Sequence, residues 1–304
     1  NPRPSLIIRK RYAKELNLDH QGMGDKMAVV LAESLKRLPY VQSINLADNN
    51  LTDVGMSPVL SSILTIPNLL ELNLSINTIG PESAKSLALY LSSDNCPLQR
   101  LLLSNADVDD FECSNFVEAV KMNRTLKEID LSNNKIGHAE NLNTVMPDII
   151  TGGEALADLL RCPECPIETL KLAWNLLRLD GAVDFVSSLS VNNTLTYLDL
   201  SYNALGRAAG VVLGDAIIDN KSLQTLKLCN NGLHACAVFT ICQGIIENHS
   251  LRKVALDGNP IGEQGARALM PGRAVSALQS TATWASKTVT VAASASLLPV
   301  TCTH

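Results

Sequence analysis

The stretch Leu126-Lys-Glu-Ile-Asp-Leu-Ser-Asn-Asn134-Lys-Ile136-Gly137 decides the fold, because close copies of it recur along the chain. Clear copies are Val41-Gln-Ser-Ile-Asn-Leu-Ala-Asp-Asn49-Asn-Leu51, Leu69-Leu-Glu-Leu-Asn-Leu-Ser-Ile-Asn77-Thr-Ile79-Gly80 and Leu195-Thr-Tyr-Leu-Asp-Leu-Ser-Tyr-Asn203-Ala-Leu205-Gly206. Nine copies can be aligned, and their fourth residues are 28, 28, 29, 28, 41, 28, 28 and 28 positions apart. Such a regular period indicates a repeat architecture. The nine fourth-position residues are Leu16, Ile44, Leu72, Leu101, Ile129, Leu170, Leu198, Leu226 and Val254.

Each copy predicts one short strand, one turn and one helix. Aliphatic residues alternate through the first part of the copy, as expected of a strand. The following stretch, such as Ser83–Leu91, repeats its apolar residues at helical spacing. A single strand–helix unit cannot bury both of its apolar faces, so the units must stack on one another. We therefore expect an α/β fold: a right-handed, horseshoe-shaped solenoid of about nine repeats, with a parallel sheet inside and helices outside.

An asparagine recurs at position nine of most copies, where the chain leaves the predicted strand. Its carboxamide can bond main-chain groups that stacking would otherwise bury without partners, at about 1–3 kcal/mol for each orphaned group. Gln21 and Ala106 replace this asparagine in the first and fourth copies, where we expect looser turns. The asparagines of this predicted structural ladder are Asn49, Asn77, Asn134, Asn175, Asn203, Asn231 and Asn259.

The repeats resemble leucine-rich repeats of the ribonuclease-inhibitor-like class, through their 28-residue length, N-x-I/L-G turn and long helix. That class includes ribonuclease inhibitor, the sensor domains of nucleotide-binding immune receptors, Ran GTPase activators, tropomodulin-like proteins and some ciliary scaffold proteins. The resemblance covers roughly residues 12–270. It implies the scaffold and a role in binding another protein, but not the identity of that partner.

Two places depart from the repeat. The 41-residue interval contains about 13 extra residues, at 138–151, which are either a tolerated insertion or a loop that contacts a partner. The segment 271–304 follows the repeat domain (1–270), is rich in Ser, Thr and Ala, and has no acidic residue. We expect it to be disordered; the alternatives are an out-of-frame or unspliced translation, or a strand between Val289 and Val300. The apolar residues of the insertion are Leu142, Val145, Met146, Ile149 and Ile150.

Composition excludes several classes of function. The 304 residues are 46% hydrophobic and carry a formal net charge of -5, which argues against a nucleic-acid binder that uses a general basic field. No run of 18 apolar residues occurs, so we expect no transmembrane helix and no membrane partner. The chain begins with Asn1 and has no basic-then-apolar leader, which indicates a fragment or a processed chain.

The cysteines and histidines do not form a catalytic or metal-binding pattern. Eight cysteines are spread over the chain, mostly in apolar stretches, which predicts free thiols and an intracellular, cytoplasmic protein. Cys162-Pro-Glu-Cys165 has no second pair at zinc spacing and does not open a helix after a strand. The five histidines are dispersed. We therefore expect no enzyme activity, no metal, no cofactor and no small-molecule substrate.

Four Asn-x-Ser/Thr sequences fall at one phase of the repeat, immediately before the first leucine of a strand. In a secreted protein they would suggest glycosylation. Here the repeat explains them, because Asn and Ser/Thr close a helix and turn the chain into the next strand. They are therefore not evidence for secretion. Their asparagines are Asn123, Asn192, Asn220 and Asn248.

Candidate binding residues come from the predicted inner face. Position five of the fifth to eighth repeats gives Asp130, Lys171, Asp199 and Lys227, which can neutralise one another across neighbouring strands. Position eight of the sixth and seventh repeats gives two adjacent aromatics, which are typical of interface anchors but could also simply stack on each other. The predicted partner-binding residues are Trp174, Tyr202, Lys171, Asp199 and Tyr197.

These observations favour a non-catalytic protein-interaction module that binds another protein on its concave face, as part of a larger receptor or scaffold. The first alternative is a GTPase-activating protein of the Ran activator type, although members of that family tend to carry an acidic segment after the repeats and this chain has none there. The second alternative is a cytoskeletal or axonemal structural component.

Overall fold

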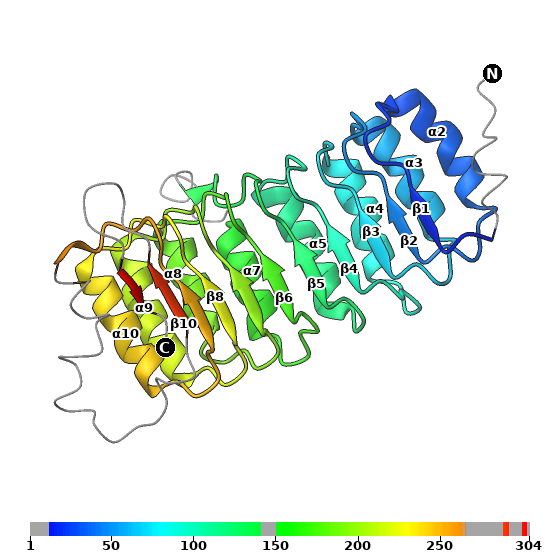
Figure 1. Ribbon diagram of the computed structural model, residues 1–304. Helices are drawn as coiled ribbons and strands as arrows, with labels where there is room; N and C mark the ends of the chain where they lie inside the picture. The colour runs from blue at the N-terminus through cyan, green and yellow to red at the C-terminus, as the bar shows by residue number, and fades with distance from the viewer. Residues whose placement is uncertain (1–11, 141–149, 264, 266–287, 292–299, 303–304) are drawn as a thin grey trace. The chain divides into compact units, whose positions relative to one another are not determined.

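The computed structural model describes residues 12–140, 150–263, 265, 288–291 and 300–302. The chain divides into two compact units. Unit 1 is Asn1–Lys135 with Glu164–Ile167, and unit 2 is Ile136–Pro163 with Glu168–His304. In each unit the strands of the repeats form a parallel sheet, with helices covering one face and the other face open (Figure 1).

In unit 1, strands and helices alternate strictly, and each strand pairs with the next one along the chain in parallel. The register places equivalent residues side by side: Leu16 opposite Ile44, and Leu72 opposite Leu101. The elements are β1 (Glu15–Asn17), α2 (Gly24–Leu35), β2 (Ser43–Asn45), α3 (Asp53–Ile63), β3 (Glu71–Asn73), α4 (Pro81–Leu91), β4 (Arg100–Leu102), α5 (Asp110–Met122) and β5 (Glu128–Asp130).

Unit 2 repeats the same alternation and the same register. Its elements are α7 (Gly152–Arg161), β6 (Thr169–Lys171), α8 (Leu179–Ser188), β7 (Tyr197–Asp199), α9 (Gly206–Asp219), β8 (Thr225–Lys227), α10 (Ala235–Glu247), β9 (Lys253–Ala255), β10 (Thr288–Val291) and β11 (Val300–Cys302). Strands β6 to β9 are parallel neighbours in chain order.

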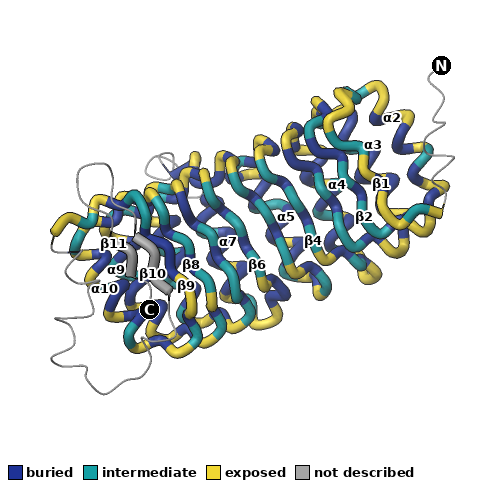
Figure 2. Tube along the Cα trace, in the orientation of Figure 1, coloured by how far each residue is buried: buried dark blue, intermediate teal, exposed yellow. Residues whose placement is uncertain are grey.

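The core lies between each sheet and its helices, as the buried segments in Figure 2 show. The middle residue of each strand from β1 to β9 is one of the nine predicted fourth-position residues, and each of them is at most 2% exposed. Large helix side chains such as Phe116 and Phe185 complete the core from the other side. The predicted fold class, an α/β solenoid of about nine repeats, is thus confirmed.

The position-nine asparagines connect consecutive repeats. The Asn134 Oδ1 accepts hydrogen bonds from the N–H groups of Ala106 and Val108, each at 3.0 Å. Its Nδ2 donates to the carbonyls of Leu103 at 2.8 Å and Leu131 at 2.9 Å. Asn77 and Asn259 make equivalent bonds in their own repeats, and Asn49, Asn175, Asn203 and Asn231 make part of the same set. At Ala106, the backbone carbonyl accepts from the Ile79 N–H at 2.9 Å, so this turn keeps an inter-repeat bond that the sequence did not predict.

The asparagines of the four Asn-x-Ser/Thr sequences form a second set of such links at the helix-to-strand turns. All four are at most 4% exposed. The Nδ2 of Asn220 donates to Leu189 O at 2.7 Å, and that of Asn248 donates to Ile217 O at 2.8 Å. Asn123 and Asn192 make the matching bonds to Leu91 and Leu160. The nitrogen to which a glycan would be attached is therefore buried and bonded in each of them.

The two departures from the repeat are described in part. Helix α7 begins at Gly152, directly after the insertion, with a capping box in which Thr151 and Glu154 bond each other's backbone N–H groups. Four of the five apolar insertion residues, Leu142, Val145, Met146 and Ile149, lie outside the described residues, and Ile150 is 61% exposed. In the segment 271–304, β10 pairs in parallel with β9, and β11 pairs antiparallel with β10. The strand alternative spanned Val289 to Val300, and the two described strands lie at its ends. The other residues of 271–304, on which the prediction of disorder also falls, lie outside the described residues.

Candidate functional site

One residue in every repeat leaves its strand in the left-handed backbone conformation. It is always position eight, directly before the ladder asparagine. The residues are His20, Asp48, Ile76, Asn105, Asn133, Trp174, Tyr202, Asn230 and Gly258, with φ between 52° and 71°. Only glycine, and to a lesser degree Asn and Asp, adopts this conformation readily, whereas it costs about 1–2 kcal/mol for other L-residues. At this position, Ile76, Trp174 and Tyr202 are therefore energetically unfavourable residues.

Trp174 and Tyr202 stack directly on each other at the open face of unit 2. Their ring centroids are 3.9 Å apart, and their planes differ by 7°. Even so, Trp174 is 57% exposed and Tyr202 is 40% exposed. Both readings from the sequence therefore apply to the geometry: the rings pack against each other, and they also present a large apolar surface to solvent.

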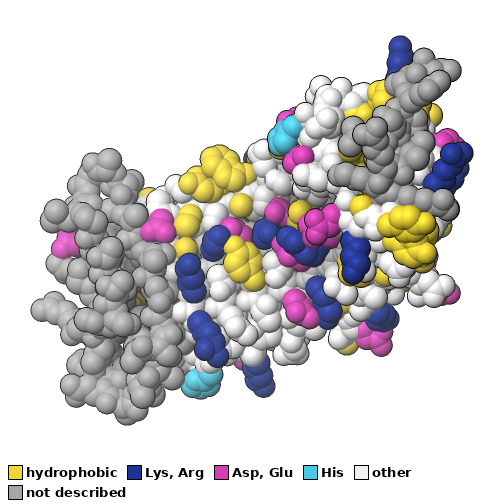
Figure 3. Space-filling model, turned by 45° about the vertical axis from the view of Figure 1, so that its right-hand side comes forward, with side chains coloured by type: hydrophobic (Ala, Val, Ile, Leu, Met, Phe, Trp, Pro, Cys, Tyr) yellow, Lys and Arg dark blue, Asp and Glu magenta, His cyan; other side chains and the backbone are white. Residues whose placement is uncertain are grey.

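Two exposed leucines follow Trp174 in the chain. Leu176, in the turn after β6, is 38% exposed, and Leu179, the first residue of α8, is 56% exposed. We call Trp174, Leu176, Leu179 and Tyr202 the aromatic patch. Sequence reasoning missed the leucines, although a signal was present: the position of Leu176 is occupied by Asn50, Thr78, Asp107 and Lys135 in unit 1. Figure 3 shows exposed hydrophobic side chains lying among charged ones on one face of the molecule.

The other predicted site residues lie on the neighbouring strands, and their charges are largely neutralised. The Lys227 Nζ lies 3.1 Å from the Asp199 Oδ2 and 5.4 Å from the centre of the Tyr197 ring. Contact with Tyr197, and then with Asp199, raises the pKa of Lys227 above its usual value. Lys171 faces Asp199 from β6 in the sheet register. The structure thus places Tyr197, Asp199 and Lys171 on the two strands that precede Trp174 and Tyr202.

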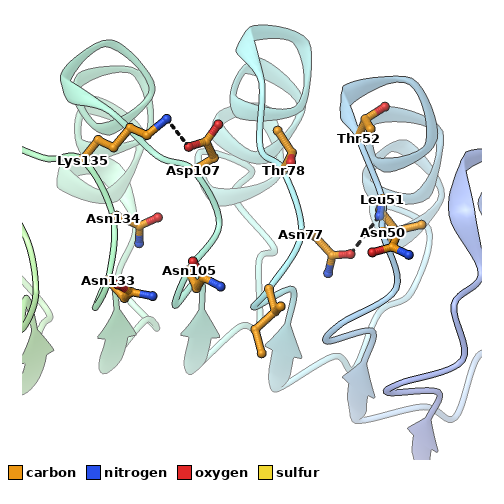
Figure 4. Close-up of a pocket in the computed structure, with 11 residues that line it drawn as sticks. Asn50, Leu51, Thr52, Asn77, Thr78, Asn105, Asp107, Asn133, Asn134 and Lys135 are labelled. Atoms are coloured by element: carbon orange, nitrogen blue, oxygen red, sulfur yellow. Dashed lines mark hydrogen bonds and ion pairs between the residues drawn. The ribbon is translucent and has the colours of Figure 1, made fainter.

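A second candidate site is a groove of about 610 Å³ in unit 1, formed by the turns that follow β2, β3, β4 and β5. Figure 4 shows the side chains of Asn105 and Asn133 side by side above the ends of neighbouring strands. At the rim, the Lys135 Nζ lies 2.5 Å from the Asp107 Oδ1. The sequence did not predict this groove, because its lining comes from turns of four separate repeats.

The described residues contain no group of three or more His, Cys, Asp and Glu side chains that could hold a metal ion. No disulfide bond is formed by Cys96, Cys113, Cys162, Cys165, Cys229, Cys236 or Cys242. Burial raises the pKa of Cys242 to about 12. A thiol with so high a pKa is a poor nucleophile at neutral pH. Among the described helices, none has the length and apolar character needed to cross a membrane.

Comparisons with known proteins agree with this architecture. A family model described as "Leucine Rich repeat" matches residues 37–60, 65–88, 123–138, 191–214 and 247–270. "NACHT, LRR and PYD domains-containing protein 5" of Mus musculus is 31% identical over 207 residues, which are 67% of this chain and 17% of that protein. "Ribonuclease inhibitor" of Mus musculus is 28% identical over 203 residues, 66% of this chain and 42% of that protein. The chain therefore spans less than half the length of these two relatives.

Among solved structures, "Leiomodin-1 Actin-Binding Site 2 (ABS2)" is similar over 62% of this chain and 85% of that one. The sequences are 18% identical over the match, and the TM-score is 0.38.

Proposed function

Because this chain is a leucine-rich repeat protein of the ribonuclease-inhibitor-like class, we propose that it is a non-catalytic module that binds another protein. The binding surface in this proposal is the aromatic patch of unit 2, flanked by Tyr197, Lys171 and Asp199. The relatives support the general role, since ribonuclease inhibitor is by its name a protein that acts on another protein. The module would be part of a larger receptor or scaffold, in keeping with the greater length of its relatives.

The observation that carries the proposal is the exposure of two stacked aromatics in a costly backbone conformation. The left-handed conformation costs about 1–2 kcal/mol per residue, and an aromatic pair returns about 0.5–1.5 kcal/mol. Trp174 and Tyr202 therefore contribute little net stability, whereas asparagine at the same position avoids most of this cost. Backbone strain of this kind is concentrated at functional sites. An exposed Trp and Tyr on a rigid scaffold are also typical anchors of protein interfaces.

The test replaces each aromatic by the residue that other repeats carry at the same position. Trp174→Asn and Tyr202→Asn should each weaken binding of a partner by roughly 30-fold, which corresponds to about 2 kcal/mol for an interface anchor. Both variants should keep or slightly raise the unfolding midpoint, because asparagine tolerates the left-handed backbone. Binding is measured by calorimetry with a partner captured on the full chain, and unfolding by urea titration.

Asn230→Gly is the matched control, since Asn230 occupies position eight of the next repeat and is also left-handed. This variant should change neither the affinity for the partner nor the unfolding midpoint. If both aromatic variants lower the unfolding midpoint and leave the affinity unchanged, the pair serves packing only and the proposal fails.

We also propose that the protein acts inside the cell, in the cytoplasm. Two observations support this compartment: seven of the eight cysteines form no disulfide bond, and the four asparagines of the glycosylation sequences are buried with their Nδ2 atoms bonded. Disulfides are rare in reducing compartments, and a buried asparagine side chain cannot carry a glycan in the folded state.

A further inference from the structure

We propose that the groove of unit 1 binds an extended, uncharged peptide segment of a partner through that segment's main-chain amides. The groove belongs to unit 1 alone, and the aromatic patch belongs to unit 2. The inference is therefore independent of the function proposed for the aromatic patch. It rests on the hydrogen-bonding groups of the groove, on its charge and on one exposed apolar residue.

Three carboxamides of the groove point into solvent without a hydrogen-bond partner in the described part of the chain: those of Asn50, Asn105 and Asn133. All three residues are exposed and left-handed, with φ of 52°, 52° and 57°. By contrast, the carboxamides of Asn77 and Asn134, which also line the groove, are hydrogen-bonded to backbone groups as part of the ladder. The groove thus offers three sets of free N–H donors and carbonyl acceptors held on rigid turns.

The charge of the groove does not favour an ionic ligand. Asp107 is neutralised by Lys135 at 2.5 Å. The N-termini of the helices that begin beside the groove are already occupied by carboxylates: Asp53 accepts from the N–H groups of Glu82 and Ser83, and Asp109 accepts from the N–H of Phe111. A helix N-terminus whose N–H groups are bonded in this way has little left to attract an anion.

Ile76 supplies the apolar contact in the groove. Its side chain is 44% exposed, and its φ is 56°, which is a true outlier for a β-branched residue. The repeats on either side carry Asp48 and Asn105 at this position, and both types tolerate the conformation better. Ile76 therefore makes this turn less stable than Asn or Asp would, and it exposes an apolar side chain among the carboxamides of the groove.

The chemical complement of such a groove is a peptide main chain. A peptide unit presents one N–H donor and one carbonyl acceptor, and a carboxamide presents the same two groups, so the two can bond reciprocally. An extended segment leaves these groups unpaired, as in peptides that bind by adding main-chain hydrogen bonds. Small apolar side chains of the segment would contact Ile76.

The experiment uses the full chain labelled with ¹⁵N and the blocked peptide N-acetyl-(Thr-Val)₃-amide as the probe. The expected result is a saturable shift of the side-chain amide resonances of Asn50, Asn105 and Asn133, while the Asn230 amide, at position eight of unit 2, does not move. A depsipeptide of the same sequence, with esters in place of alternate amides, should bind at least tenfold more weakly because it lacks those N–H donors. Equal binding of the two probes, or no shift at millimolar peptide, overturns the proposal.

Variants separate this site from the aromatic patch. Asn105→Asp and Asn133→Asp remove side-chain donors and should weaken the probe at least tenfold, and aspartate is tolerated at this position, as Asp48 shows. Ile76→Asn should weaken the probe and raise the unfolding midpoint. Asn230→Asp and Trp174→Asn should leave probe binding unchanged. A loss of probe binding in these two variants equal to that in the groove variants would contradict the assignment.

Discussion

At the scale of single residues, the ladder asparagines illustrate how one side chain can fix two repeats at once. Asn134 satisfies two buried N–H groups of the preceding repeat, one carbonyl of that repeat and two carbonyls of its own repeat. Alanine at this position would leave these groups buried and unbonded. The ladder asparagines therefore stabilise the fold mainly by hydrogen-bonding backbone groups, and only secondarily by the burial of their own side chains.

We expect Asn134→Ala to lower the free energy of unfolding by roughly 2 kcal/mol or more, since each orphaned group costs about 1–3 kcal/mol. The suitable control is Asn133→Gly, which removes an exposed carboxamide and keeps the left-handed backbone without strain. Urea denaturation measures both variants. Equal destabilisation by the two changes would show that the bonds of Asn134 are not what stabilises this turn.

The same pair of residues shows what the sequence could and could not predict. The phase of the repeat is visible in this pair: Asn133 is exposed and Asn134 is buried. It did not predict the left-handed conformation of position eight, because residues as different as Ile76, Trp174 and Asn133 occupy it. Their shared conformation is set by the hydrogen bonds between repeats, which no single copy contains.

At the scale of elements, carboxylates of one repeat cap the helix of the next. Asp25 accepts hydrogen bonds from the N–H and the hydroxyl of Thr52, at 2.8 and 2.7 Å. Asp53 accepts from the Ser83 N–H at 2.6 Å and the Glu82 N–H at 3.1 Å. The N-cap of α4 is Gly80, which has no side chain of its own to cap the helix, and a Cβ there would collide with Asp53.

The same capping continues in unit 2 from within the insertion. Glu140 is buried and accepts a hydrogen bond from the Gly181 N–H at 3.3 Å, near the start of α8. A Cβ on Gly181 would overlap the carboxylate of Glu140, so the two residues depend on each other. This pairing was not predictable from the repeat, because 41 positions separate the residues and the insertion interrupts the repeat phase.

Removal of one inter-repeat cap should have a measurable cost. We expect Asp53→Ala to destabilise the protein by about 0.5–2 kcal/mol, the usual range for a lost N-cap. Asp180→Ala is the matched control, because Asp180 lies exposed in the first turn of α8. The control should cost only a few tenths of a kcal/mol through the helix dipole. If Asp53→Ala lowers the free energy of unfolding no more than the control does, the N-terminus of α4 does not depend on the Asp53 carboxylate for its stability.

Helix α5 should make stability depend on pH near neutrality. Glu112 is 7% exposed and forms a capping box with Asp109. Burial, and then the neighbouring Asp109, raise the pKa of Glu112 to about 7 from its ordinary value of 4.5. Between these two values the folded state holds a proton that the unfolded chain has released. Stability should therefore fall as the pH rises through this window, by up to about 1 kcal/mol per pH unit, and level off above it.

We expect Glu112→Gln to remove this dependence, because glutamine preserves the capping box but does not titrate. The variant should match the parent protein near pH 4 and exceed it in stability at pH 8. Urea unfolding between pH 4 and 8 measures both proteins. Parallel stability curves for the two proteins across this range would contradict the assigned role of Glu112.

At the scale of the whole molecule, the segment after the repeats covers an open strand. Strand β10 pairs along β9, which would otherwise be an exposed edge. We expect a chain ending at residue 270 to keep its far-UV circular dichroism signal, because no repeat position is lost, but to self-associate at high concentration through β9. Sedimentation velocity measures the association. Collapse of the truncated chain, or strict monomer behaviour, would contradict this expectation.

Over the whole chain, the fold was far more predictable than the sites. A period of 28 residues fixes the strands, the helices and the register, because every repeat must solve the same packing problem. The sites depend on exceptions to that period: Leu176 beside Trp174, or Asn105 and Asn133 on one rim. A residue that departs from the repeat pattern can be recognised in the sequence. Whether it contributes to a site depends on which other such residues lie next to it in the folded protein.

The ladder also has a consequence for the chemical ageing of the protein. Asn231 precedes Gly232, and an Asn-Gly pair in a flexible chain deamidates when the glycine nitrogen attacks the side-chain carbonyl carbon. In the folded protein, Asn231 is fully buried and its Nδ2 donates to Leu200 O at 2.9 Å and Cys229 O at 3.2 Å, so the side chain is held in one orientation. In the unfolded chain the reaction is free to occur: ammonia leaves, and water then opens the cyclic imide to aspartate or isoaspartate. Either product has a carboxylate where the ladder requires a donor. Heat inactivation thus becomes irreversible through a covalent change at one residue of the unfolded chain.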